Sequence, residues 1–419
     1  MLAVKVLLSL MDVNTYNHQT ERYRSVRSDA LPEPHDPAKC GFGISGRACI
    51  FVLMPIEHGK PEVERAVLIG LTTDSRRRQE HLESLGELRL LAHTAGAEVL
   101  AERVQVRPKP DPAHYIGKGL VEELKAQLSE LDGNCVIFDD PLNPAQQRNL
   151  EQALEVKVID RPVLILDIFA SGARTAAARL QVELAQLEYT LPRLTGAWVH
   201  FSRQYGGIGA KGPGETQLEV DRRRVRDKIA HLKKKLKKLG VQRETQRKAR
   251  SDLFKIALVG YTNAGKSTLF NALTKAEIET ADKLFTTLDS TTRVMSVGYP
   301  VRVVFSDTVG FIHKLPHQLV ESFKSTLEEV ARADLLLHVT DCSDPKMTEH
   351  IEQTSEVLAE IGANRVPYVM IYNKLDANPD FTPPSVDSSR AFAVSALRAQ
   401  GLAALKAELV ARSARPRPA

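Results

Sequence analysis

Cysteine is scarce in this chain of 419 residues: it has four, at Cys40, Cys49, Cys135 and Cys342. They are scattered and no two of them have the C-x-x-C spacing, which argues against a disulfide framework and against a zinc site. Apolar runs are also short, and none reaches the 18 residues of a membrane-spanning helix. The apolar start MLAVKVLLSLM lacks a basic leader and a small-residue cleavage site, which argues against a secretory signal. We therefore expect free thiols in a reducing cytoplasm.

The chain also lacks a strong charge bias, since its formal net charge is only +5. That value alone does not indicate a nucleic-acid partner, and the distribution of charge matters more than its sum. The length suggests two or three domains, and a hydrophobic content of 43% is ample for their cores.

Residues 1–60 show no sustained periodicity and are rich in turn formers, so a poorly ordered extension is predicted there. Regular alternation begins near Arg65, where RAVLIGL, EVLAERVQV, CVIFDD and VKVID have strand character and helical patterns separate them. This alternation predicts a small parallel α/β domain over residues 61–173.

Residues 174–250 have a different pattern, with two long helical segments separated by a glycine-rich stretch, GGIGAKGPG. The simplest interpretation is a helical hairpin. Its second half holds 14 Lys or Arg against three acids between Asp221 and Arg250. Apolar Val225, Ile229, Leu232, Leu236 and Leu239 form a stripe on one side, so the basic side chains lie on the others. Contact with a polyanion and a merely solvated face both remain open from this pattern.

Strand and helix alternate again over residues 251–419, in KIALVG, VRVVFSD, LLLHVTD, PYVMIYN and AFAVS. The separations suit crossover helices, which predicts a second α/β domain with an open parallel sheet. The overall fold class is therefore α/β, with a helical hairpin between two α/β domains.

The first of these strands leads into a glycine-rich turn, LVGYTNAGKST. The spacing G-x-x-x-x-G-K-S, placed between a strand and a helix, is that of a phosphate loop whose N–H groups surround an anion. In this interpretation Lys266 bridges the β- and γ-phosphates and Ser267 ligates Mg²⁺. The predicted contacts are Gly260, Tyr261, Thr262, Asn263, Ala264, Gly265, Lys266, Ser267 and Thr268.

Two further strands end in groups that suit the same nucleotide. FSDTVG places Asp307, Thr308, Val309 and Gly310 at a strand end, where the acid can hold a metal-bound water and the glycine N–H can approach a γ-phosphate. VMIYNKLD places Asn373, Lys374, Leu375 and Asp376 at the end of another of these strands. A carboxylate at 376 can accept two N–H bonds that guanine offers and adenine does not.

A last strand, AVSAL, supplies Ser395, Ala396 and Leu397, where a backbone N–H can reach guanine O6. This order of four segments resembles the translation-factor class of GTPases. The resemblance implies a Ras-like G domain, and it implies that a threonine in KLFTTLDSTTR closes over Mg²⁺ and the γ-phosphate. Thr287 is favoured, with Thr286 as its competitor. Nucleotide contacts are accordingly expected at Phe285, Thr286, Thr287, Leu288 and Asp289.

From the same resemblance, Lys266 and Thr287 are the candidate catalytic residues, and Ser267 and Thr287 the candidate Mg²⁺ ligands. One departure is Phe311, which stands where Ras-like enzymes carry a water-positioning glutamine. Because a phenyl ring cannot orient water by hydrogen bonding, slow intrinsic hydrolysis is expected. Asn263 resembles the asparagine of potassium-assisted GTPases, which makes K⁺ a further candidate cofactor.

The front half carries motifs of its own: GGIGAKGPGETQLEVDRRR, AHYIGKGLVEEL, DDPLNPAQQRNLE, VIDRPVLILDIF and LQVELAQLEYTLPRL. They resemble the HflX family of GTPases, and the resemblance extends from about Arg65 to Ala419. Family members usually have Thr-Arg in the glycine-rich stretch, where this chain has Ala210 and Lys211. That departure concerns RNA contacts rather than GTP hydrolysis.

The family implies GTP hydrolysis stimulated by the large ribosomal subunit, binding to its ribosomal RNA, and splitting of stalled ribosomes. It also implies a cytoplasmic protein that associates with ribosomes, and we expect a monomer. ATP binding at the N-terminal domain is a further implication, with HYIGKG as the candidate loop. The alternative is an RNA-remodelling or ribosome-binding module whose N-terminal domain uses ATP. A third interpretation is a scaffold on which nucleotide is never hydrolysed, and the Mg²⁺ set of Ser267, Thr287 and Asp307 argues against it.

Overall fold

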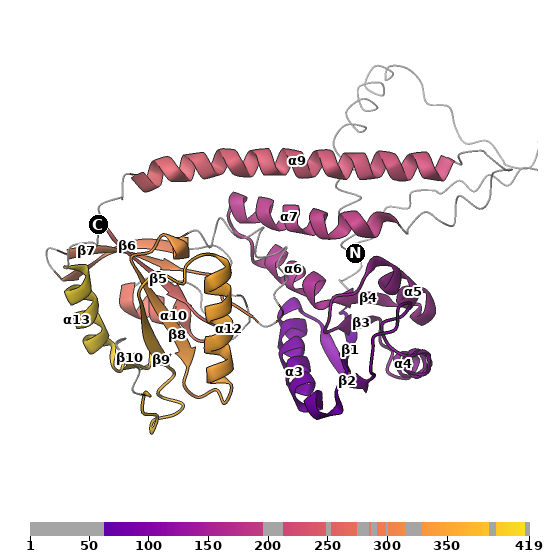
Figure 1. Cartoon of the computed structure of the whole chain (residues 1–419), viewed down its shortest axis with the longest axis horizontal. Coiled ribbons are helices and arrows are strands. Elements are labelled where there is room, and N and C mark those ends of the chain that lie inside the picture. Colours follow the sequence, from indigo (N-terminus) through magenta and orange to yellow (C-terminus); the bar gives the residue numbers. More distant parts are fainter. Residues whose placement is uncertain are drawn as a thin grey trace, which may run out of the picture. The chain divides into compact units, whose positions relative to one another are not determined.

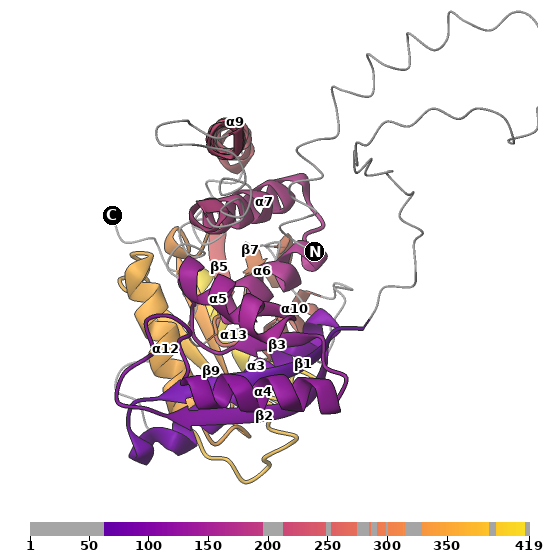
Figure 2. The ribbon, with the colours of Figure 1, turned by 90° about the vertical axis from the view of Figure 1, so that its right-hand side faces the viewer.

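The structure is a computed structural model of the chain. It describes residues 63–195, 213–248, 253–274, 285, 291–298, 301–312, 314, 329–384 and 391–414. The predicted extension over residues 1–60 and the glycine-rich stretch GGIGAKGPG up to position 212 lie outside the described residues. Residues Val63–Ala419 belong to one compact unit, shown in Figure 1 and, turned by 90°, in Figure 2.

The N-terminal domain is built on a four-stranded sheet in the order β2-β1-β3-β4, with every neighbouring pair parallel. Its strands are β1 (Arg65–Thr72), β2 (Glu98–Val106), β3 (Cys135–Phe138) and β4 (Lys157–Asp160). Its helices are η1 (Ser75–Arg77), α3 (Arg78–Ala95), α4 (Lys118–Glu130), α5 (Pro144–Leu154) and α6 (Arg161–Gly172). The predicted parallel α/β arrangement is confirmed.

Both faces of this sheet are buried, because side chains alternate along each strand. Ala66 and Leu68 pack with α3 and α6 on one face. Val67 and Ile69 pack with α4 and α5 on the other. The strands therefore have continuous apolar runs, as is usual for a parallel sheet covered on both sides.

Helix α6 was not expected from the sequence, because the apolar run PVLILDIF fits a buried strand as well as a buried helix. Its first turn decides the conformation. The carboxylate of Asp160 accepts a hydrogen bond from the Val163 amide, and Pro162 occupies the start of the helix. Both features are typical helix-start signals.

Helices α7 (Ala176–Thr190) and α9 (Pro213–Lys248) run side by side and confirm the predicted hairpin of helices (Figures 1 and 2). The short η2 (Leu191–Thr195) follows α7. Val225 and Leu232 of the predicted stripe are buried. Lys228 and Lys233 pair with carboxylates of α7 at 2.8 Å and 2.7 Å. Many of the other basic side chains of α9 are exposed.

The second domain has a six-stranded sheet in the order β10-β9-β8-β5-β7-β6. Its strands are β5 (Phe254–Val259), β6 (Thr291–Gly298), β7 (Val301–Asp307), β8 (Leu335–Asp341), β9 (Tyr368–Asn373) and β10 (Ala391–Ala393). Strand β6 was not expected, and it pairs antiparallel with β7, so the sheet is not wholly parallel. The sequence of β6, TTRVMSVG, is largely polar, as an edge strand with one exposed side permits.

Helices α10 (Lys266–Thr274) and α13 (Leu402–Ser413) cover one face of this sheet, and α12 (Met347–Glu360) covers the other. The carboxyl ends of β5, β7, β9 and β10 lie at the same end of this sheet, because these strands run parallel. In open parallel sheets ligands bind at this edge, so the topology brings the four predicted segments together. None of the helices that the structure describes has the length and apolarity needed to cross a bilayer.

Candidate nucleotide site

The phosphate loop joins β5 to α10 and depends on two glycines. Gly260 has a φ of 148°, and a Cβ there would lie 2.0 Å from the Val339 carbonyl oxygen. Gly265 has a φ of 83°, and its Cβ would lie 2.3 Å from Nδ2 of Asn373. No L side chain fits either position, so the motif glycines are required by the fold as well as by an anion's approach.

Lys266 begins α10 and is buried, with only 6% of its surface exposed. Its Nζ donates a hydrogen bond to the Tyr261 carbonyl at 2.6 Å, so the ammonium group folds back over the loop. Burial lowers the pKa of Lys266 to about 8, and the charge of Asp307 opposes that shift. A phosphate beside Nζ would favour the charged form, because it supplies the missing anion.

Ser267 and Asp307 lie next to each other at the start of α10 and the end of β7. The Ser267 hydroxyl donates to Oδ2 of Asp307 at 2.7 Å, and Asp307 is fully buried. Mg²⁺ prefers oxygen ligands of these two kinds, in a site that also includes water and phosphate oxygens. The two residues therefore fit an Mg²⁺ site. Thr287, the third predicted member, lies outside the described residues.

The segment after β7 lies directly on the phosphate loop. The Thr262 amide donates to the Phe311 carbonyl at 2.7 Å, and the Phe311 amide donates to the Gly260 carbonyl at 3.2 Å. A Cβ at Gly310 would lie 2.9 Å from Nζ of Lys266. Thr308 anchors the segment from the other side, since its hydroxyl donates to the Leu258 carbonyl. DTVG and the phosphate loop thus form one continuous surface.

Asn373 connects the two ends of the site. Its Nδ2 donates to the Ala264 carbonyl at 3.0 Å, and its Oδ1 accepts from the Ala396 amide at 3.0 Å. The side chain is 2% exposed. A single buried amide therefore holds together the phosphate loop, the end of β9 and the loop after β10.

The carboxylate of Asp376 lies at the predicted base-recognition end. It accepts a hydrogen bond from the Ser395 hydroxyl, and this bond keeps the pKa of Asp376 below its ordinary value. Lys374 has a φ of 63° and pairs with Asp341 at 2.7 Å, which fixes its stem beside the same edge. The Leu375 amide donates to the Val394 carbonyl. Leu397 is 77% exposed, so its side chain takes no part in the core.

The remaining predicted contacts divide into described and undescribed residues. Thr268 lies half-buried on the first turn of α10. Val309 is 9% exposed and belongs to the core of the N-terminal domain. Phe285 packs edge-on against Phe169 of α6, with ring centres 4.7 Å apart, so its ring faces the N-terminal domain. Outside the described residues lie Thr286, Thr287, Leu288 and Asp289.

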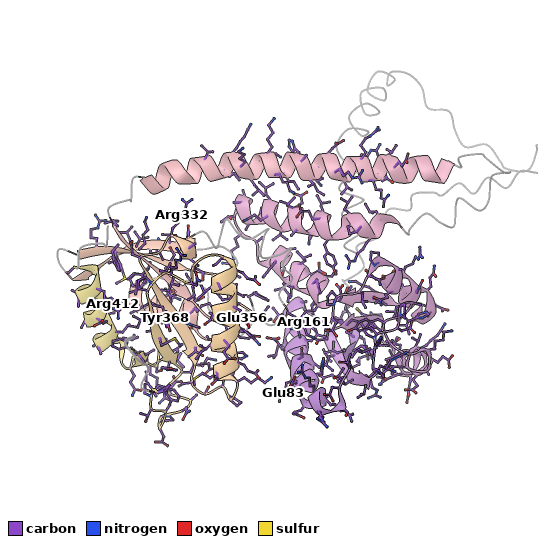
Figure 3. The ribbon with its side chains drawn as sticks, in the orientation of Figure 1. Glu83, Arg161, Arg332, Glu356, Tyr368 and Arg412 are labelled. Atoms are coloured by element: carbon purple, nitrogen blue, oxygen red, sulfur yellow. The ribbon has the colours of Figure 1, made fainter. Side chains whose placement is uncertain are left out.

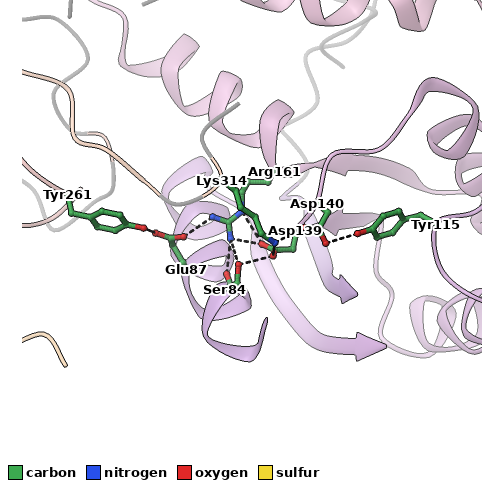
Figure 4. A network of polar contacts seen from close by, with 8 residues as sticks. All are labelled: Ser84, Glu87, Tyr115, Asp139, Asp140, Arg161, Tyr261 and Lys314. Carbon is green, nitrogen blue, oxygen red and sulfur yellow. Dashed lines mark hydrogen bonds and ion pairs between the residues drawn. The ribbon is translucent and has the colours of Figure 1, made fainter. Parts of the chain in front are cut away.

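A polar network beside the site was missed by sequence reasoning (Figure 4). Its centre is Arg161 at the start of α6, which is fully buried. The guanidinium contacts Asp139 at the end of β3 and Glu87 of α3, the latter at 2.8 Å. Tyr261 of the phosphate loop donates its hydroxyl proton to Glu87.

The same network reaches the segment after DTVG. Lys314 contacts Asp139 and Asp140 with its ammonium group, the latter at 2.6 Å. Burial disfavours the charged form of Asp139, but Arg161 and Lys314 outweigh it and lower the pKa of Asp139 to about 2. Both nucleotide-facing segments are thus attached to the N-terminal domain. The only sequence signal for this attachment would be the pairing of these acids with a buried arginine. That pairing cannot be recognised in the sequence, because the partners lie far apart in it.

Comparison with known proteins agrees with this geometry. Family models match consecutive parts of the chain: "GTP-binding GTPase N-terminal" at residues 82–170, "GTP-binding GTPase Middle Region" at 172–250 and "50S ribosome-binding GTPase" at 255–374.

Proteins named GTPase HflX are similar over most of their length. The one from Flavobacterium psychrophilum is 47% identical, covering 76% of this chain and 77% of that protein. The one from Caldanaerobacter subterraneus subsp. tengcongensis is 51% identical, over 75% and 73%. The one from Escherichia coli K12 is 46% identical, over 76% and 75%. The chain therefore belongs to the HflX family of GTPases and is a GTP-hydrolysing enzyme.

Proposed function

We propose that the chain is a GTP-driven switch that binds the large ribosomal subunit and acts in splitting stalled ribosomes. The observation that carries this proposal is the Asn373 side chain, which fixes the base end and the phosphate end of the site in one rigid frame. A family model described as a 50S ribosome-binding GTPase matches residues 255–374, which include both ends. This match supports the large subunit as the partner.

At the phosphate end, we assign Lys266 to the β- and γ-phosphates, where its charge stabilises the transition state. Ser267 and Thr287 would hold Mg²⁺, with Asp307 beside Ser267. When bound, Mg²⁺ neutralises charge on the phosphate oxygens. The closeness of Gly310 to Lys266 supports a role for its amide near the γ-phosphate.

At the base end, we assign Asp376 to the two N–H groups that distinguish guanine from adenine. Its depressed pKa supports this role, because an ionised carboxylate only accepts hydrogen bonds. The stem of Lys374 would pack on the base plane. The amides of the Ser395–Leu397 turn would approach O6.

Slow hydrolysis in the absence of a partner is part of the proposal. Phe311 is 2% exposed, and its backbone is bonded to the phosphate loop, so this position offers no side chain that could orient water. The water would be positioned by the large subunit, with K⁺ near Asn263 as a further candidate. Asn263 has a φ of 61°, which shows that the backbone at this tip is held in an unusual conformation.

We further propose a division of labour along the chain: residues 61–173 as one domain, 174–250 as a helical hairpin that contacts ribosomal RNA, and 251–419 as the G domain. The family models, which meet near residues 171 and 252, support these boundaries. The exposed basic side chains of α9 suit a phosphate backbone. We also propose that the protein is a cytoplasmic monomer and that the HYIGKG loop of its N-terminal domain binds ATP.

The test measures phosphate release from GTP and from ATP, with and without purified large subunits. We expect GTP turnover to rise strongly with large subunits and ATP turnover to stay low. Ribosome splitting is then followed by light scattering with GTP and with a non-hydrolysable analogue. GTP turnover that large subunits do not change would contradict the ribosomal role while leaving the GTPase identity intact.

A further inference from the structure

A cavity of about 670 Å³ lies between α3 of the N-terminal domain and α12 of the G domain. The tip of the phosphate loop forms part of its wall, through Tyr261, Thr262 and Asn263. These three residues also belong to the predicted nucleotide contacts, whereas the carboxylates of α3 and α12 that form much of the remaining wall have no role in the proposed function.

Two acidic ridges line this cavity. Each repeats one spacing, i, i+3 and i+7, which places its three carboxylates on one face of a helix. Glu83 and Glu356, one from each ridge, are labelled in Figure 3. Helix α3 contributes Glu80, Glu83 and Glu87, and helix α12 contributes Glu349, Glu352 and Glu356.

The protein neutralises only part of this charge. Glu83 pairs with Lys346, and Glu87 pairs with Arg161. The other four carboxylates of the ridges are exposed, and the part of the chain that the structure describes gives them no ion-pair partner. Like charges at these spacings destabilise a helix, and facing ridges repel each other. The cavity therefore carries an excess of negative charge that a bound cation would neutralise.

A second observation, independent of the carboxylates, also indicates a missing ligand. Thr262 is 6% exposed, and its hydroxyl has no hydrogen-bond partner among the described residues. Thr262 is one of the residues that line the cavity. Oε1 of Gln353, which also lines the cavity, is buried without a donor among the same residues.

We propose that this cavity binds a linear polyamine, with ammonium groups spaced along a methylene chain. Ammonium groups only donate hydrogen bonds, which suits carboxylates, Oε1 of Gln353 and the Thr262 hydroxyl. A ridge from i to i+7 extends about 10.5 Å, which favours an extended molecule. Leu90, which lines the cavity and is 54% exposed, offers apolar surface for the methylenes.

A single divalent ion suits the site less well. Among the described residues, no group of three or more His, Cys, Asp or Glu side chains converges to hold a metal ion. A polyamine that bridges the ridges would tie α3 to α12 beside the phosphate loop, and so hold the two domains together. This inference does not rest on the proposed ribosomal function.

Calorimetry with spermidine and the full chain, with GDP and a fixed Mg²⁺ concentration, tests the proposal. The ridge variant Glu349→Gln/Glu352→Gln/Glu356→Gln should bind spermidine about tenfold more weakly, since it loses three ammonium–carboxylate contacts. The matched control Glu122→Gln/Glu123→Gln/Glu130→Gln makes the same charge change on exposed residues of α4. It should keep the wild-type affinity.

Three results would overturn the proposal. The first is a loss of spermidine affinity in the control variant as large as that in the ridge variant. The second is that MgCl₂ at matched ionic strength abolishes the difference in spermidine affinity between the two variants. Either result would indicate general charge screening rather than a specific site. The third is a lysine-rich peptide that binds more tightly than spermidine with the same dependence on the ridge, because the occupant would then be a protein partner. Glu80→Gln should weaken spermidine binding about twofold, as expected if the ligand also contacts α3.

Discussion

The two sheets of this protein present strand-end carboxylates in different ways. In the N-terminal domain, Asp139 and Asp140 follow β3, and Arg161 and Lys314 neutralise them. In the G domain, Asp307 ends β7 and Asp376 follows β9, and each accepts a hydrogen bond from a serine hydroxyl. The carboxyl edge of a parallel sheet is thus a ligand site only where the protein's own cations leave the acids available. In the first domain the same edge serves as a joint between domains.

The largest expected effect is on the G-domain side of this comparison. Asp376→Asn should reduce discrimination of GTP against ATP by roughly 10⁴-fold, because the carboxylate that accepts both guanine N–H groups is lost. Binding of xanthine nucleotides should improve correspondingly. Competition binding with GDP, ADP and XDP measures this change, and retained guanine preference would rule out Asp376 as the base-selecting residue.

The second largest effect is expected from Lys266→Ala. Removing a positioned cation from the phosphates is expected to slow GTP hydrolysis by about 10³-fold in the presence of large subunits. Phosphate release measures the rate, and Lys109→Ala, at an exposed loop position, is the matched control. Hydrolysis at the wild-type rate would show that the buried lysine is structural.

A smaller effect is expected from the joint between domains. Arg161→Met should lower the free energy of unfolding by about 3–5 kcal/mol, because it leaves Asp139 buried without its main cation. Denaturant unfolding measures this loss, with Arg77→Met, an exposed arginine of η1, as control. Equal stability of the two variants would mean that the network does not support the fold.

The smallest effect concerns Lys314 and acid stability. The folded-state pKa of Asp139 is about 2, below the ordinary 3.8. The stability that it contributes is therefore present above pH 3.8 and is lost as the pH falls through about 2. Lys314→Ala should raise this pKa and move acid unfolding to higher pH. An unchanged acid midpoint by circular dichroism would show that Lys314 does not hold the carboxylate in its ionised form.

The sequence could predict the nucleotide site because each of its motifs is local. The residues of the phosphate loop are contiguous, and their glycines fix the backbone wherever the surrounding sheet lies. The topology then brings the strand ends together, as alternating strands and helices predict. Asn373 illustrates this, since its two partners come from segments that sequence patterns had already placed at that edge.

The network around Arg161 could not be predicted in this way. Its partners Asp139, Glu87 and Lys314 come from separate elements, and nothing local distinguishes a buried arginine from an exposed one. Phe285 is similar: its ring packs against Phe169, a contact that depends on the placement of another domain. Strand β6 and helix α6 were missed because an edge strand tolerates polar residues, and because a short apolar run fits either conformation.

The most direct test of the central claim is calorimetry of the wild-type chain with GDP and with ADP, both with Mg²⁺. If Asp376 selects the base while Lys266 holds the phosphates of the same molecule, GDP should bind with clear heat and ADP should bind at least about 10³-fold more weakly. Equal affinity for the two nucleotides would contradict the assignment of both ends of the site.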